Sequence, residues 1–154
     1  MIRACLTASA VLAGSGALAD CAEDLVTVAG AFGQAQFNIE LADDPEERAR
    51  GLMFREDLPT FDGMLFVYDA PGRVAFWMRN TLIPLDMIFV DETGRVTQIH
   101  ENAVPGDVTP IPGPDDTLAV LEINGGLAGR LGIAEGAMLG HPAFNQEIAA
   151  LPCG

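Results

Sequence analysis

The sequence predicts a mainly β (α+β) domain, an antiparallel β-sandwich or barrel-like sheet that carries two short helices. Short apolar runs recur along most of the chain with turn residues between them, which is typical of small antiparallel sheets. Helical patterns occur at only two places, and both are short. With 154 residues, 49% of them apolar, the chain has the length of one ordinary domain and enough apolar side chains for a packed core.

The first two strands are expected at residues 25–28 and 36–41. In the second run apolar and polar residues alternate, so one face of this strand is expected to be buried. Gly30 and Gly33 lie between the runs and indicate a turn that joins them.

The first helix is expected directly after this pair of strands. Asp44 is a good N-cap, Pro45 suits the first helical position, and the two glutamates that follow face the positive end of the helix dipole. Gly51 ends this helix, unless the helix continues to Met53.

Five further apolar runs are expected to be strands. They span residues 64–68, 74–79, 85–90, 96–100 and 118–123. Turn residues at 69–72 and 91–94 are interpreted as hairpin connections.

The remaining segments are a long loop and a second helix. Residues 105–116 are rich in proline and predict a loop that is long for a compact domain. A helix with Leu127 and Leu131 on one face is expected to follow residues 124–126 and to end at Gly132. The Gly pair at this junction is interpreted as a turn, the alternative being that its backbone N–H groups bind an anion.

The N-terminal residues predict a secretory signal peptide at 1–19 that is cleaved from a single domain at 20–154. Arg3 is followed by an apolar segment too short to span a bilayer, and Ala17-Leu18-Ala19 has the pattern of a cleavage site. A short membrane anchor and a lipoprotein modified at Cys21 are the alternatives, the second disfavoured because Asp20 precedes the cysteine. We therefore expect a periplasmic or extracellular protein without a stable membrane anchor after cleavage.

Two cysteines remain after such cleavage, Cys21 and Cys153, one near each end of the chain. In an oxidising compartment an even number of cysteines predicts a disulfide. The bond requires the two ends of the domain to meet.

Composition excludes several classes of function. A net charge of −14 argues against nucleic acid as a partner, because phosphate binding depends on Lys and Arg. Residues 20–154 contain no Ser and no Lys, so serine hydrolase and lysine Schiff-base chemistry are excluded. His100 and His141 lack the spacing of metal ligands, and the methionines lie in apolar runs, so no metal or cofactor is expected.

Charged residues inside apolar strands are the candidates for chemistry. Asp86 and Glu122 each lie in a run whose neighbours on the same side of the strand are apolar. A buried, unpaired carboxylate costs several kcal/mol, so both are expected to have partners, and Arg79 is the nearest cation along the sequence. An ion pair without further function and a cluster facing a ligand are equally consistent with this pattern.

Five segments of the chain resemble the bacterial and archaeal family called domain of unknown function 192. They are Gly51-Leu52-Met53-Phe54-Arg55, Gly63-Met64-Leu65-Phe66, Phe76-Trp77-Met78-Arg79-Asn80-Thr81, Ile83-Pro84-Leu85-Asp86-Met87 and Leu121-Glu122-Ile123-Asn124-Gly125-Gly126. The resemblance covers about residues 36–140 and implies a small mainly-β domain, often exported, without an established activity. Where the family commonly has Lys before Asn-Thr, this chain has Arg79, which favours a bidentate contact with a carboxylate.

Three classes of function are consistent with these features. We expect first an exported module that binds a small ligand or acts as an accessory protein, with a pocket lined by Trp77, Arg79, Asn80, Thr81, Asp86 and Glu122. The first alternative is a hydrolase or lyase that uses Asp86 and Glu122 as acid and base. The second alternative is an interaction or assembly factor with an exposed apolar patch around Phe54, Phe61 or Phe66.

Overall fold

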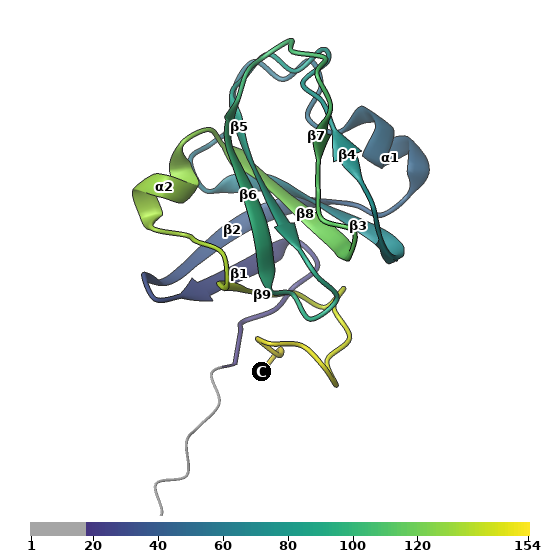
Figure 1. Ribbon diagram of the computed structural model, residues 1–154. Coiled ribbons are helices and arrows are strands. Elements are labelled where there is room, and N and C mark those ends of the chain that lie inside the picture. The colour runs from purple at the N-terminus through teal and green to yellow at the C-terminus, as the bar shows by residue number, and fades with distance from the viewer. Residues whose placement is uncertain (1–17) are drawn as a thin grey trace, which may run out of the picture.

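The computed structural model describes residues 18–154 (Figure 1). The predicted signal peptide thus lies outside the described residues, except for its last two positions. The chain forms nine strands and two short helices in this region. Their bounds are β1 (Leu25–Gly30), β2 (Gly33–Ala42), α1 (Pro45–Arg50), β3 (Asp62–Gly72), β4 (Ala75–Phe76), β5 (Leu85–Val90), β6 (Val96–Ala103), β7 (Ile111–Pro112), β8 (Thr117–Asn124), α2 (Leu127–Leu131) and β9 (Met138–Gly140).

Seven strands form one sheet in the order β6-β5-β8-β3-β2-β1-β9, and β4 pairs with β7 in a small second sheet. All neighbours in the large sheet are antiparallel except β2 and β3, which are parallel. The start of β6 reaches the opposite edge at β9, where the Val96 N–H donates to the Ala137 carbonyl. The sheet therefore curls into a half-barrel, and the expectation of a mainly β fold with two short helices is confirmed.

Four segments differ from the sequence-based expectations. The run at 74–79 forms strand only at Ala75–Phe76, and residues 69–72 belong to β3, where a register shift interrupts the pairing with β8. The proline-rich segment contains the short strand β7, and β9 was not predicted.

Both helices lie beside the sheet, on opposite sides of the molecule (Figure 1). Asp44 caps α1 as predicted, because its carboxylate accepts from the Glu46 and Glu47 amides at 2.8 Å. Helix α2 has no such side chain at its own N-cap, since that position is Gly126.

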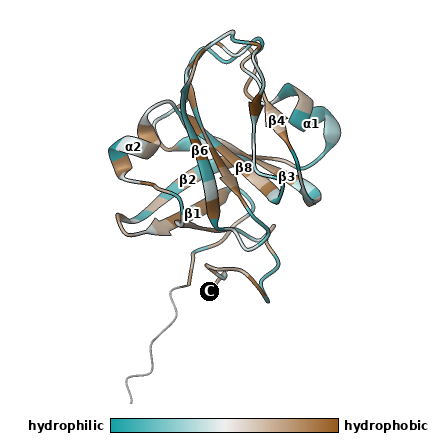
Figure 2. Cartoon of the chain, in the orientation of Figure 1, coloured by the Kyte–Doolittle hydropathy of each residue, from teal (hydrophilic) through white to brown (hydrophobic). Residues whose placement is uncertain are grey.

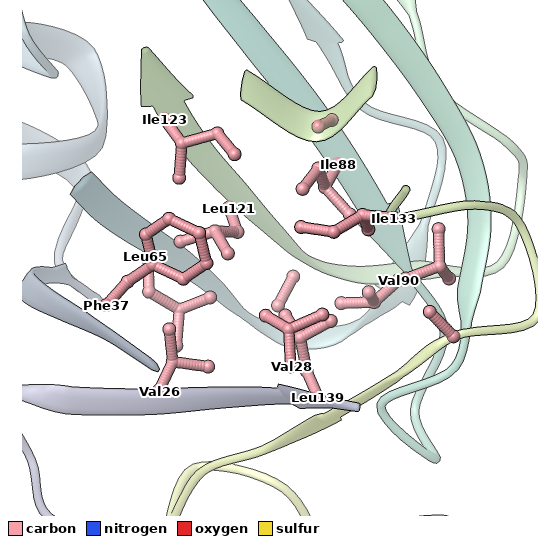
Figure 3. Packing of buried hydrophobic residues seen from close by; sticks show 14 of the residues in the cluster. Val26, Val28, Phe37, Leu65, Ile88, Val90, Leu121, Ile123, Ile133 and Leu139 are labelled. Carbon is pink, nitrogen blue, oxygen red and sulfur yellow. The ribbon is translucent and has the colours of Figure 1, made fainter. Parts of the chain in front are cut away.

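Apolar side chains pack on both faces of the curled sheet in two clusters. Figure 2 shows the hydrophobic residues along its strands. The larger core lies inside the curl and includes α2; Figure 3 shows Val28, Leu65, Ile88 and Leu139 packed in it. The smaller core lies between the other face and the segment that carries β4 and β7, and it includes Phe66 and Phe89. Neighbouring residues of one strand therefore enter different cores.

The two ends of the domain meet, as predicted. Cys21 and Cys153 form a disulfide with their Cα atoms 5.5 Å apart. Beside it, Ala19 is buried and donates its N–H to the Pro152 carbonyl. Among residues 18–154 there is no helix with the length and apolar character needed to cross a membrane.

Candidate functional site

Glu122 lies in the middle of the sheet, on the face of the smaller core. It is paired with Met64 of β3 and with Met87 of β5. Residues directly opposite in antiparallel strands point to the same face, so the carboxyl is placed between two methionines in an apolar environment.

The Glu122 carboxyl is buried and has no partner among residues 18–154. The residue is 4% exposed, and burial raises the pKa of the carboxyl to about 8. Within residues 18–154 no hydrogen bond or ion pair to another group offsets this effect. In this region every side-chain oxygen that is fully sealed from solvent has a hydrogen-bond partner. The oxygens of Glu122 have none, so they are in contact with the solvent-accessible space beside them.

That space is a pocket of about 40 Å³, large enough for two or three water molecules. Three parts of the chain enclose it: the end of α1 with the loop after it, strands β3 and β8, and the segment from β4 to Thr81. The lining residues are Arg48, Ala49, Arg50, Gly51, Leu52, Met53, Phe66, Phe76, Trp77, Thr81 and Glu122.

A close approach of backbone to aromatic ring shapes one wall. Gly51 has a φ of 51°, and a Cβ there would lie 3.2 Å from the ring of Phe66. The following loop is tied to the opposite wall, because the Phe54 N–H donates to the Asn80 carbonyl at 2.8 Å. Both residues have positive φ, 65° at Phe54 and 55° at Asn80, so this contact holds two non-glycine residues in the left-handed region.

Trp77 stands at the rim. It is 46% exposed, and the Arg79 guanidinium carbon lies 5.4 Å from the centre of its ring. A wider and more open apolar hollow of about 290 Å³ adjoins the same tryptophan and is lined by Ala75, Phe76, Trp77 and Pro110. Trp77 therefore lies between the pocket of about 40 Å³ beside Glu122, called the slot below, and this larger apolar hollow, called the shelf below.

The arginines of α1 line the pocket, but within the described residues neither forms an ion pair with Glu122. Arg48 donates to the carbonyls of Asp43 and Val67 and lies over the ring of Tyr68. The hydrogen bond from Arg55 and, to a smaller extent, the charge of Arg50 lower the pKa of Glu40, whereas burial raises the pKa of Glu122. Neither arginine of α1 serves as a counterion for the buried carboxyl.

Asp86 does not belong to this pocket, which corrects the predicted site. It is paired with Ile123, whose side chain enters the larger core, so Asp86 and Glu122 point to opposite faces of the sheet. The Asp86 carboxylate accepts from three backbone N–H groups, those of Asn102, Gly126 and Ala128, at 2.7–2.8 Å. The backbone N–H groups after the Gly125-Gly126 pair therefore bind the side chain of Asp86, which anchors the start of α2.

The predicted convergence of Arg79, Asp86 and Glu122 is wrong, and with it the pairing of the two carboxyls as acid and base. Of the predicted residues, Trp77, Thr81 and Glu122 line the pocket, while Arg79 and Asn80 lie at its edge. The predicted apolar patch is also only partial, because Phe54 and Phe61 are exposed but Phe66 is buried.

Sequence reasoning missed the wall formed by the α1 end and Phe76. A signal was present, since Gly51-Leu52-Met53, Phe66, Phe76-Trp77 and Glu122 all lie in the segments that carry the family resemblance. Four of these five segments, far apart in sequence, meet at the pocket.

Comparison with known proteins gives a family without a function. A family model for DUF192, described as "Uncharacterized ACR", matches residues 26–141. A crystal structure of a protein of unknown function from Novosphingobium aromaticivorans DSM 12444 is 54% identical, with a TM-score of 0.73 over 75% of this chain and 82% of that one. A Sinorhizobium meliloti 1021 protein called a "putative transcription regulator" is 38% identical, with a TM-score of 0.74 over 79% of this chain and 95% of the other. No curated protein matches the sequence.

Proposed function

We propose that this chain, which belongs to the family of domain of unknown function 192, is an exported ligand-binding or accessory module. Its ligand places a polar group beside Glu122 and rests the remainder on the apolar shelf at Trp77. The proposal keeps the expected function and replaces half of the expected site.

One observation carries the proposal: the Glu122 carboxyl is 4% exposed, has no partner in the described part of the chain, and faces an open pocket. Burying such a group costs several kcal/mol, and a structural role normally comes with compensating hydrogen bonds. Asp86 in the same sheet has that compensation from three N–H groups, whereas no described residue provides it for Glu122. A cost of this kind is typical of functional positions.

Binding is favoured over catalysis by two carboxyls, because the second carboxyl is on the other face of the sheet. It is also favoured over DNA or RNA binding, although the Sinorhizobium relative is called a "putative transcription regulator". A net charge of −14 repels phosphate, and affinity for nucleic acid comes largely from cations.

The experiment is a fragment screen by two-dimensional NMR on the oxidised, purified chain. We expect hits that shift the Trp77 indole N–H together with the amides of Gly51 and Thr81. Glu122→Gln should weaken such hits by about tenfold or more, which corresponds to the loss of one hydrogen bond to a buried group. Glu147→Gln, the same change at an exposed position, should leave them unaltered.

The proposal is rejected if a diverse set of polar fragments gives no shift at these three positions. It is rejected equally if hits occur elsewhere and respond alike to both variants.

A further inference from the structure

From the groups that surround Glu122, we infer that the ligand carries a primary ammonium group on a short apolar chain. The ammonium enters the slot beside Glu122 and the chain lies across Trp77. This inference rests on the proposed function and adds the chemical class of the ligand.

Glu122 lacks a counterion within the described residues, because no cation that lines the pocket or its rim forms an ion pair with it. Arg48 donates to two carbonyls, and Arg79 lies over the ring of Trp77. Tyr68 of β3 is the remaining titratable neighbour, and the pKa of its hydroxyl is raised, mainly by burial. Because no described residue serves as a counterion for ionised Glu122, a cation that enters the pocket would take that role.

The polarity of the pocket wall also favours a cation. The C-terminal end of α1 lines the slot, and the carbonyls of Arg48 and Ala49 accept no backbone N–H from the described residues that follow the helix. Carbonyls at a helix C-terminus carry a partial negative charge and favour cations. The aromatic residues Phe66, Phe76 and Trp77 also line the slot, and the faces of such rings attract ammonium groups.

The volume of the slot limits the size of the cationic group that can enter. A slot of about 40 Å³ accepts a methylene-ammonium end of two or three heavy atoms but not a guanidinium with its surrounding solvent. The adjoining hollow of about 290 Å³ can take a chain of several methylenes. Each methylene buried there adds about 0.8 kcal/mol, so affinity should rise with chain length.

The long-range field points in the same direction. With 22 acidic and 8 basic residues, the protein attracts cations and repels anions. An anionic ligand would meet this field, the α1 carbonyls and a carboxyl group together.

The test compares three probes of one shape, n-butylammonium, 1-butanol and butyrate, each titrated into the full oxidised chain by NMR and calorimetry. We expect butylammonium to bind in the millimolar range, at least tenfold more tightly than either of the others. Because Glu122 is protonated before the cation enters, binding at pH 7 should release about 0.9 proton, measured as the dependence of the heat on buffer ionisation. Affinity should rise about tenfold per pH unit below pH 8 and become constant above it.

Glu122→Gln should abolish the proton release and the pH dependence, with Glu147→Gln as the matched control. If Glu122→Gln fails to fold, the pH dependence of butylammonium binding by the wild-type chain decides alone, and an affinity that stays constant below pH 8 would overturn the assignment. Tighter binding of butanol or butyrate at the same three NMR positions would overturn the ammonium assignment and leave the proposed function standing. If none of the three probes binds, the assignment of an ammonium ligand is also overturned. The fragment screen then tests separately whether the pocket binds any ligand.

Discussion

Replacing Glu122 by Gln should remove most of the pH dependence of stability above pH 4.5. The pKa of Glu122 is about 8 in the folded chain and 4.5 when the group is solvated, so the folded state holds its proton more tightly than the unfolded state. Stability from this proton is complete below pH 4.5 and is lost as the pH rises to about 8. A gap of about 3.5 pH units at about 1.4 kcal/mol per unit gives a loss of about 5 kcal/mol, of which about 3 kcal/mol is lost by pH 7.

The assay is urea unfolding followed by tryptophan fluorescence, at intervals from about pH 4 to pH 9, on the wild-type chain, Glu122→Gln and Glu147→Gln. Because every other titrating group is common to the wild type and Glu122→Gln, the difference between these two proteins isolates one carboxyl. Glu122→Gln should match the wild type within about 1 kcal/mol in acid and exceed it by about 5 kcal/mol above pH 8. Glu147→Gln should follow the wild type throughout. A constant difference between wild type and Glu122→Gln across this range would refute the account of a buried, unpartnered carboxyl.

Three further predictions concern the scaffold that holds the pocket. Asp86→Ala leaves three backbone N–H groups without their acceptor and should lower the free energy of unfolding by about 3–5 kcal/mol. The control Asp116→Ala, at an exposed position, should change it by no more than about 0.5 kcal/mol. Equal effects of the two substitutions would contradict the anchoring role of Asp86. Reduction of the disulfide between Cys21 and Cys153, 132 residues apart, should cost roughly 4–5 kcal/mol by chain entropy, and an unchanged urea midpoint with reductant would contradict it. Gly63→Ala places a Cβ 2.5 Å from the Glu122 carbonyl oxygen and should destabilise the β3–β8 pair by about 1–3 kcal/mol, whereas Gly72→Ala meets nothing within 4 Å and should be near neutral; thermal unfolding separates the two outcomes.

Much of the fold was predictable because it depends on local patterns. Alternation of apolar and polar residues identified strands, and Asp44 followed by Pro45 identified the start of α1. The disulfide followed from there being two cysteines after the predicted leader. Strand direction and pairing are not local properties, so the parallel contact of β2 with β3 and the three-residue strand β9 left no recognisable signal.

The candidate site was half predictable for the same reason. Asp86 and Glu122 were each identified as carboxyls in apolar strands, and both are buried. Which face each one enters depends on the register of β5 against β8, where Asp86 is opposite Ile123 and Glu122 is opposite Met87. A shift by one residue moves a side chain to the other face, and the sequence of either strand alone does not determine that register.

The most direct measurement is an NMR titration of the Glu122 side-chain carboxyl in the intact, oxidised chain, with ¹³C-labelled glutamate and Glu122→Gln to assign the signal. We predict a midpoint of about 8, far from the exposed glutamates of the same spectrum. A midpoint near 4.5 would mean that the carboxyl is already solvated or paired, and the pocket would lose the property on which its proposed role depends.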